Sequence, residues 1–311
     1  MTLIADSGST KTAWCVAESS HDIIYTQGIN PFQQNEEEIC AVLRHELLPS
    51  LQALCHRHQD PSKTMVHPPL ASTEAGERVF FYGAGCTPEK APIVAQALRQ
   101  VLGQAVRISV ESDMLGAARG LCGRQPGIVA ILGTGSNSCF YDGRHLHTGN
   151  PALGYILGDE GSGAYIGKRL VGDILKRQLP DDVCQLFFDE THETQASIIQ
   201  KVYRTPLPNR FLASLSPFCI RHRQHPAIHA FIIDCFEQFF NRNIRPALPR
   251  WRDITPDAST LSGKPQVHFV GSIAHFYRSE LTEAAAQCGY QVGHIMQSPL
   301  EGLVEFHREG A

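Results

Sequence analysis

The sequence has no long hydrophobic run and no excess of positive charge. None of its apolar stretches approaches the ~20 residues that a membrane-spanning helix needs. Residues 1–6 lack the basic flank and the long apolar core of a signal peptide. The formal net charge of -4 argues against a nucleic-acid-binding surface, which requires clustered basic residues. We therefore expect a cytoplasmic protein with neither nucleic acid nor membrane as a partner.

Closely spaced cysteines are also missing. The chain has 10 cysteines, and no two of them form a CxxC pair. A disulfide framework or a zinc ribbon would show tighter spacing, so we expect reduced thiols. Two groups of histidines lack a neighbouring carboxylate or cysteine that would complete a metal site, and we expect solvated surface side chains there: His145 with His147, and His222 with His225 and His229.

The 311 residues, of which 42% are hydrophobic, suit two domains. Short apolar runs predict strands at residues 2–5, 13–17, 23–27, 79–82 and 106–110. Helical spacing predicts helices at 36–58, at 88–102 and from 114, and residues 60–77 are predicted to form a polar loop. Strands that alternate with helices predict an α/β fold with a largely parallel sheet, here opened by a hairpin.

The same pattern starts again at residue 127. A predicted strand at 127–132, a small polar turn and a further strand at 139–141 repeat the opening of the chain, which indicates a weak internal repeat at domain scale. Residues 161–245 are predicted to be mostly helical, 250–266 a polar loop, and 267–270 and 293–296 strands. We expect one domain at 1–116 and another at 117–298, with a C-terminal helix at about 299–311 packing on the first.

Two turns in this repeat have the composition of phosphate-binding loops. Residues 6–10 and 133–137 are rich in glycine and hydroxyls, and the N–H groups of such turns bind anions. Neither turn fits the P-loop pattern or GxGxxG, and the first could equally be a plain hairpin turn. A third Gly-Ser pair follows a predicted strand. The candidate phosphate or nucleotide contacts are Gly8, Ser9, Thr10, Lys11, Gly133, Thr134, Gly135, Ser136, Gly271 and Ser272.

Three carboxylates and one amide stand where a ligand could be bound. Asp6 is a candidate to hold Mg²⁺, which prefers carboxylate, water and phosphate oxygens. Asp113 closes a predicted strand and could act as a general base or merely cap the next helix. Asp159 lies in an acidic turn that could accept sugar hydroxyls or form a capping box. Asn30 could bind a sugar or belong to an ordinary turn.

These segments, in this order, resemble a known family. The chain resembles the BadF/BadG/BcrA/BcrD-type ATPases and, among them, the N-acetylglucosamine kinase-like branch of the actin-like ATPase superfamily, which also includes acetate and sugar kinases and heat-shock ATPases. The resemblance covers nearly the whole chain. It rests on residues 6–12, 28–31, 111–117, 133–137, 158–162, 271–274 and 298–303, of which Gly158-Asp159-Glu160-Gly161-Ser162 is the most specific.

The resemblance implies two ribonuclease-H-like domains with ATP and Mg²⁺ in a nucleotide cleft between them. It implies ATP-dependent phosphorylation of an amino sugar, with N-acetylglucosamine and its 6-phosphate as the first expectation, and it is compatible with a homodimer. By this resemblance Asp113 is the base on the sugar 6-hydroxyl, and Gly271 and Ser272 lie against the adenosine. The residues that would hold the sugar are Asn30, Asn137 and Asp159.

One departure and two other functions stay open at this point. The mammalian kinase has Trp-Gly where this chain has Leu153-Gly154, so N-acetylmuramic acid, glucosamine or another amino sugar could be the substrate. Redox activators of the same family bind an iron–sulfur cluster between two subunits, but Cys122 and Cys139 do not lie in the motif expected for that. A non-catalytic nucleotide or sugar sensor is the second alternative, although both Asp6 and Asp113 are present.

Overall fold

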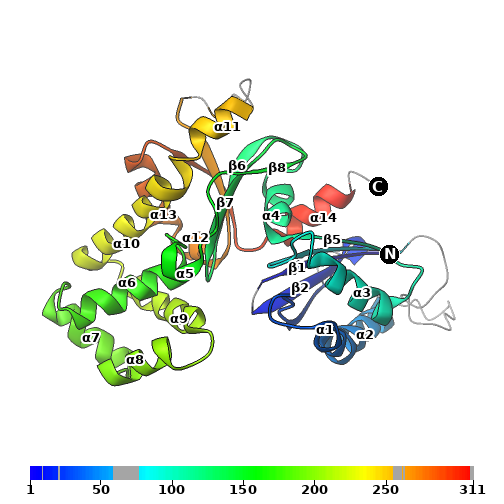
Figure 1. Cartoon of the computed structure of the whole chain (residues 1–311), viewed down its shortest axis with the longest axis horizontal. Coiled ribbons are helices and arrows are strands. Elements are labelled where there is room, and N and C mark those ends of the chain that lie inside the picture. Colours follow the sequence, from blue (N-terminus) through cyan, green and yellow to red (C-terminus); the bar gives the residue numbers. More distant parts are fainter. Residues whose placement is uncertain (9, 20–21, 59–76, 255–260, 262, 309–311) are drawn as a thin grey trace. The chain divides into compact units, whose positions relative to one another are not determined.

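The computed structural model describes residues 1–8, 10–19, 22–58, 77–254, 261 and 263–308, without the side chains of 55–58. The chain forms two compact units (Figure 1), one of residues 1–124 with 298–311 and one of residues 125–297. The boundary expected at residue 116 falls inside helix α4 (Asp113–Cys122), which belongs entirely to the first unit. Most of the predicted loop at 60–77 lies outside the described residues.

The first unit is built on a mixed five-stranded sheet. Its strand order is β3-β2-β1-β4-β5. β1 pairs antiparallel with β2 and parallel with β4, so the predicted hairpin at the start of a largely parallel sheet is confirmed. The strands are β1 (Thr2–Ser7), β2 (Lys11–Val16), β3 (Ile23–Gln27), β4 (Arg78–Gly83) and β5 (Arg107–Ser112).

Apolar side chains project from both faces of this sheet, as expected for a largely parallel sheet. Alternate residues of β1 separate into two cores: Leu3 and Ala5 belong to one cluster, and Ile4 to the other. The first cluster takes its helical residues from α1 (Glu36–Val42), the π-helical turn η2 (Leu43–Leu47), α2 (Leu48–His58) and α3 (Ala91–Leu102). The second takes them from α14 (Leu300–Arg308), with Leu115 of α4 packed against it.

Helix α14 packs on α4 by a close backbone approach. A Cβ atom on Gly302 would lie 2.0 Å from the carbonyl oxygen of Gly120, and one on Gly120 would lie 2.7 Å from the carbonyl oxygen of Pro299. Only glycine allows two helices to come this near. The last helix of the chain is therefore part of the first unit, on the sheet face that also carries Ile4 and Tyr82.

The second unit repeats the strand order of the first. Its sheet runs β10-β9-β6-β7-β8, with β6 paired antiparallel to β7 and parallel to β9, as β1 is to β2 and β4. The weak repeat seen in the sequence is thus a repeat of topology. The strands are β6 (Gly127–Leu132), β7 (Ser136–Tyr141), β8 (Leu146–Thr148), β9 (Gln266–Val270) and β10 (Gln291–Met296).

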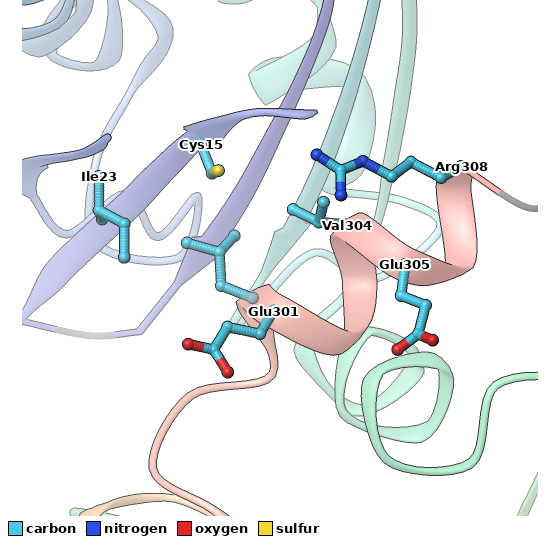
Figure 2. Close-up of a pocket in the computed structure, with 7 residues that line it drawn as sticks. Cys15, Ile23, Glu301, Val304, Glu305 and Arg308 are labelled. Atoms are coloured by element: carbon cyan, nitrogen blue, oxygen red, sulfur yellow. The ribbon is translucent and has the colours of Figure 1, made fainter. Parts of the chain in front are cut away.

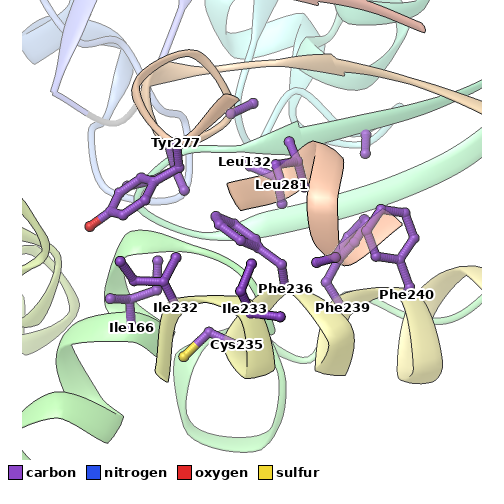
Figure 3. Packing of buried hydrophobic residues seen from close by; sticks show 14 of the residues in the cluster. Leu132, Ile166, Ile232, Ile233, Cys235, Phe236, Phe239, Phe240, Tyr277 and Leu281 are labelled. Carbon is purple, nitrogen blue, oxygen red and sulfur yellow. The ribbon is translucent and has the colours of Figure 1, made fainter. Parts of the chain in front are cut away.

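Helices form most of the second unit, as predicted for residues 161–245. They pack around a cluster of large aromatic side chains, among them Phe236, Phe239 and Phe240 (Figure 3). The helices are α5 (Gly154–Leu157), α6 (Gly163–Leu175), α7 (Asp181–Thr191), α8 (Gln195–Tyr203), α9 (Pro208–Arg221), α10 (Pro226–Phe239), the π-helical turn η3 (Phe240–Ile244), α11 (Leu248–Ile254), α12 (Ser272–Phe276) and α13 (Arg278–Gln287).

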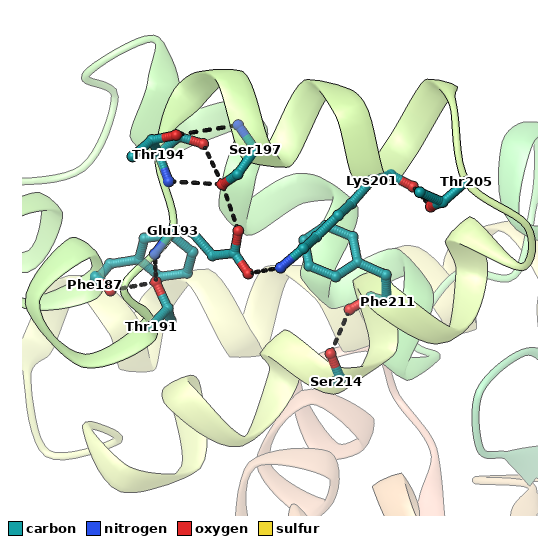
Figure 4. A network of polar contacts seen from close by, with 9 residues as sticks. All are labelled: Phe187, Thr191, Glu193, Thr194, Ser197, Lys201, Thr205, Phe211 and Ser214. Atoms are coloured by element: carbon teal, nitrogen blue, oxygen red, sulfur yellow. Dashed lines mark hydrogen bonds and ion pairs between the residues drawn. The ribbon is translucent and has the colours of Figure 1, made fainter.

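The polar network at the start of α8 shows how this helical region is held (Figure 4). Thr194 and Ser197 form a reciprocal capping box, in which each side chain accepts a hydrogen bond from the other's backbone N–H. Lys201 pairs with Glu193, and its Nζ lies 5.1 Å from the ring centre of Phe211 on α9. This pair therefore links α8 to the residues on either side of it.

Two sequence predictions in this unit are wrong. Part of the predicted polar loop at 250–266 is helix α11, because the fully buried Trp251 donates its Nε1–H to the carbonyl oxygen of His147 (2.9 Å). His147 and His222 are not freely solvated: each is 22% exposed and lies beside a carboxylate, of Asp142 (2.7 Å) and Glu190 (2.5 Å) respectively. His145, at 77% exposure, is solvated as predicted.

Among the described residues, nine cysteines have free thiols. No helix in the described part of the chain is long and apolar enough to span a membrane.

Candidate functional site

The first predicted phosphate turn joins β1 to β2, and hydrogen bonds of the residues at its base hold it in place. The Gly8 N–H donates to the carbonyl oxygen of Lys11 (3.0 Å). The buried Ser7 hydroxyl lies 2.7 Å from the Thr12 hydroxyl and donates to the carbonyl oxygen of Ile29 (3.0 Å). Sequence reasoning missed Ser7 and Thr12, although they stand in the matched motif. They fix the turn to the next loop rather than facing a ligand.

The loop at residues 28–31 lies against this turn. The Gly28 N–H donates to the Thr10 carbonyl oxygen (3.1 Å), and the Ile29 N–H donates to the Ser7 hydroxyl (3.0 Å). Asn30 Oδ1 accepts the Phe32 N–H (2.9 Å), which leaves its Nδ2 without an acceptor among the described residues. Thr10 is exposed, and Lys11 Nζ lies 4.7 Å from the Tyr25 ring centre. Ser9 lies outside the described residues.

Asp6 is a half-buried carboxylate. It is the next-to-last residue of β1, and the Ser298 hydroxyl donates to its Oδ2 (3.0 Å). The pKa of Asp6 is raised to about 6, chiefly by burial and to a smaller extent by Asp113, against the lowering effects of the Ser298 hydrogen bond and of Lys11. Ser298 is a third residue that sequence reasoning did not assign, because only the packing of α14 on this unit brings it to Asp6.

Asp113 lies at the start of α4, just after the carboxyl end of β5. The helix cap is Ser112, whose hydroxyl accepts the Leu115 N–H (3.2 Å), so the alternative in which Asp113 caps the helix is wrong. Asp113 Oδ1 accepts the neighbouring Met114 N–H (2.8 Å). Burial raises the pKa of Asp113, and the two backbone hydrogen bonds lower it less. Such a carboxyl group is suited to accept a proton.

The donor set around Asp6 fits Mg²⁺. Two carboxyl groups, Asp6 and Asp113, are near enough to raise the pKa of Asp6, and burial further disfavours their charged forms. A divalent cation would relieve both costs. Within the described residues no three His, Cys, Asp or Glu side chains form a metal cage. Mg²⁺ commonly binds to one or two carboxylates, with phosphates and water completing its shell.

The second phosphate turn, between β6 and β7, is held by the acidic loop. The Gly163 N–H at the start of α6 donates to the Gly133 carbonyl oxygen (2.9 Å), and the Ala164 N–H to that of Thr134 (3.1 Å). The Ser136 N–H donates to Asp159 Oδ1 (3.3 Å). The turn and the loop predicted from two distant segments are therefore one structure.

Asp159 has an unusual backbone. Its φ is +56°, a left-handed conformation that costs a non-glycine residue energy and is found disproportionately at functional sites. A Cβ atom on Gly135 would lie 2.9 Å from Asp159 Oδ2, so only glycine leaves room for this carboxylate. Burial raises the pKa of Asp159, and the Ser136 N–H lowers it less. The capping role belongs to Ser162, whose hydroxyl accepts the Tyr165 N–H (3.1 Å).

Glu160, which sequence reasoning did not assign, is buried beside Asp159. The Asn243 amide donates to its Oε2 (3.3 Å), and Arg242 Nη1 lies 3.9 Å from its Oε1. Both partners belong to η3, and π-helical turns are frequent at functional sites. Lys168 of α6 donates to the carbonyl oxygens of Tyr155 (2.6 Å) and Ile156 (3.4 Å). These contacts hold the acidic loop from both ends.

The third motif joins the second turn. Gly271 has φ of +120°, and a Cβ atom there would lie 2.3 Å from the Leu132 carbonyl oxygen. Its N–H donates to the Met296 carbonyl oxygen (3.0 Å), and Ser272 begins α12. Asn137 Oδ1 accepts the Ser138 N–H (2.8 Å). Each unit thus gathers its own predicted residues: the first holds Asp6, the turn at 8–11, Asn30 and Asp113, and the second holds the rest.

A hollow elsewhere in the first unit is separate from these residues. It has a volume of about 330 Å³ and lies between α14 and the strands β2 and β3 (Figure 2). Its apolar floor includes Cys15 and Val304, and Glu301, Glu305 and Arg308 stand around it. None of the predicted site residues lines it.

Comparison with known proteins gives the chain its family. No protein-family model matches it. A crystal structure of a Porphyromonas gingivalis protein, provisionally assigned as an N-acetylglucosamine kinase, is 44% identical over 99% of both chains, with a TM-score of 0.84. The chain belongs to the N-acetylglucosamine kinase-like family. The resemblance to the N-acetylglucosamine kinase-like branch is thereby confirmed, and the two units with their mixed five-stranded sheets agree with the predicted two-domain α/β fold.

Two further relatives agree with this assignment. The N-acetylmuramic acid/N-acetylglucosamine kinase of Clostridium acetobutylicum is 32% identical over 145 residues, which cover 43% of this chain and 45% of that protein. The match therefore spans less than half the length of this curated relative. A provisionally assigned N-acetylglucosamine kinase from Chromobacterium violaceum is 18% identical over 98% of both chains, with a TM-score of 0.66, and shares the fold.

Proposed function

We propose that this protein is an ATP-dependent amino-sugar kinase that converts N-acetylglucosamine to its 6-phosphate. The observation that carries the proposal is the 44% identity over 99% of both chains with the assigned kinase from Porphyromonas gingivalis. Carboxylates that such a reaction needs are present in each unit. Family membership favours this function over the iron–sulfur activator and over the sensor.

Asp113 is the proposed general base. The oxygen of the sugar 6-hydroxyl attacks the γ-phosphorus of ATP, the bond from that phosphorus to the bridging oxygen breaks, and ADP leaves. Asp113 accepts the hydroxyl proton as the new bond forms. Burial raises the pKa of this carboxyl group, which makes it a stronger base than an exposed aspartate. Phosphoryl transfer otherwise depends on positioning and charge stabilisation.

The turns are the proposed phosphate contacts. Gly8 to Lys11 and Gly133 to Ser136 would offer backbone N–H groups and hydroxyls to the ATP phosphates, while Gly271 and Ser272 would lie against the adenosine. Asp6 would hold Mg²⁺, directly or through water, with Ser298 keeping the carboxylate in place. When bound, Mg²⁺ neutralises charge on the phosphate oxygens.

The sugar contacts are proposed from Asn30, Asn137 and Asp159. Asn30 Nδ2 is a donor without a protein acceptor among the described residues, and Asp159 offers acceptor oxygens from a strained loop. Leu153, which replaces the tryptophan of the mammalian kinase, is 52% exposed. A smaller side chain there suits a bulkier sugar, so N-acetylmuramic acid is the alternative substrate. We also propose a cytoplasmic location, and a homodimer stays a prediction.

The test is ADP release from ATP and Mg²⁺ with N-acetylglucosamine, N-acetylmuramic acid, glucosamine, N-acetylmannosamine and glucose. We expect strong stimulation by N-acetylglucosamine, at least tenfold over the rate without sugar, and its loss in Asp113→Asn. Stimulation by N-acetylmuramic acid alone would change the substrate but keep the reaction. ATP hydrolysis that no sugar stimulates would contradict the proposal and favour the activator or the sensor.

A further inference from the structure

A second hollow of the first unit is lined by other residues than those predicted for the site. It has a volume of about 340 Å³ and borders the edge strand β5. Arg78, which lines it, begins β4, whereas Gly83 ends β4 beside the last residue of β1. At about 3.3 Å per residue, Arg78 lies roughly 16 Å from that end of the strand, whereas Glu111, which also lines the hollow, pairs with Tyr82 near it. None of the predicted site residues lines the hollow.

Cationic side chains dominate the lining of this hollow. The guanidinium carbons of Arg119 and Arg124 lie 5.1 and 4.7 Å from the ring centre of Phe306. Arg119 Nη1 donates to the Tyr82 hydroxyl (2.8 Å), and its Nε is buried with no hydrogen-bond partner. Burial and the positive charges of Arg119, Arg78 and Arg124 lower the pKa of His307 to about 4, so this ring is neutral near pH 7.

These charges are incompletely compensated. Within the described part of the chain, no ion pair joins Arg78, Arg119 or Arg124 to a carboxylate. The side-chain hydrogen bond seen for them there is the one from Arg119 to Tyr82. Glu111 is the single carboxylate in the lining, which leaves an excess of two positive charges, three minus one. Like charges that face one another in a hollow attract and concentrate anions.

We propose that this hollow binds a phosphate monoester of a small polar metabolite. A phosphate monoester carries a charge of about −1.5 to −2 near pH 7, which matches the excess. Arginine forks bind phosphate oxygens in pairs, so Arg78, Arg119 and Arg124 have the right donors. The volume exceeds that of a phosphate ion and leaves room for an organic part of sugar size beside the Phe306 ring. The hollow of Figure 2 differs in charge, because two glutamates and one arginine line it and leave an excess of negative charge.

The test measures binding to the full chain with its nucleotide and sugar sites already filled. Isothermal titration calorimetry is carried out in saturating N-acetylglucosamine, Mg²⁺ and a non-hydrolysable ATP analogue. The titrants are N-acetylglucosamine 6-phosphate, glucose 6-phosphate and inorganic phosphate. We expect one site that prefers an ester to inorganic phosphate, and about tenfold weaker binding in each of Arg78→Gln and Arg124→Gln. The binding is independent of the proposed kinase reaction.

The matched control is Arg99→Gln, an exposed arginine at the end of α3 that does not line the hollow. It should bind the esters like the unaltered protein. Unchanged affinity for the ATP analogue in all variants shows that they are folded. Ester binding that is equal in all proteins, or no binding beyond that of inorganic phosphate, would overturn the proposal. The arginines would then serve only to compensate the carboxyl ends of α4 and α14.

Discussion

The two units share a strand order but supply their carboxylates differently. In the first unit, Asp6 is part of the strand that leads into the phosphate turn. In the second, the turn at 133–137 contains no acid, and Asp159 reaches it from a separate loop held by α6 and η3. One topology can thus place an acid beside a phosphate turn either through the strand itself or through an insertion. The first route ties the acid to the sheet, and the second holds it on a loop through its hydrogen bond with the Ser136 N–H.

The largest effect is expected for Asp113→Asn, which tests whether the first unit supplies the general base. The change keeps the shape and the Met114 N–H contact but removes the proton acceptor, so turnover should fall by roughly 10²–10⁴-fold. Binding of the ATP analogue, measured by calorimetry, should change little. A turnover within threefold of the unaltered protein would show that Asp113 is not the general base. The first unit would then lose its proposed role of supplying that base.

The close approach of the third motif to the second turn can be broken at Gly271. Gly271→Ala must place a Cβ atom 2.3 Å from a backbone oxygen, at a φ that alanine avoids, and should lower the free energy of unfolding by about 2–4 kcal/mol. The control is Gly172→Ala in α6, where a Cβ meets nothing within 4 Å and helix propensity favours alanine by up to ~1 kcal/mol. Urea unfolding measures both. Equal stabilities would contradict the tight contact.

The role of the separate acidic loop is tested by Asp159→Asn. The amide can still accept the Ser136 N–H, but the ligand loses a charged acceptor, whose hydrogen bonds are worth about 1.5–3 kcal/mol. We expect KM for the sugar to rise about 10- to 100-fold while KM for ATP stays nearly constant. Asp189→Asn, on the exposed surface of α7, is the control. A rise in KM for ATP alone would move Asp159 from the sugar to the nucleotide.

The smallest expected effect is on stability, at Asp6. Its folded-state pKa of about 6 lies above the ordinary value of 3.8, so the native protein binds more protons than the unfolded chain in this pH window. Without ligands, stability should therefore fall as the pH rises from about 4 to 6. Asp6→Asn should remove that slope. At pH 7 it should raise the free energy of unfolding, measured in urea, by on the order of 1–2 kcal/mol. The same variant should lose activity. A variant less stable than the unaltered protein would mean that the Ser298 contact outweighs the cost of burial.

The sequence by itself determined much of this protein. Local patterns were sufficient for most strands and helices, because apolar periodicity and small polar turns are short-range signals, and the repeated turn revealed the two halves. The motifs also singled out Asp6, Asp113 and Asp159. The sequence did not reveal β8, which is only three residues long. It also did not reveal α11, whose mostly polar sequence packs on the protein through a buried tryptophan.

Only the tertiary structure decided which of these residues act together within each unit. Ser298 reaches Asp6 because α14 returns to the first sheet, and Asn243 reaches Glu160 because a π-helical turn directs it there. The raised pKa values of Asp6, Asp113 and Asp159 likewise come from burial by segments distant in the chain. Such properties depend on the desolvation and contacts that packing creates, which no local pattern of residues encodes.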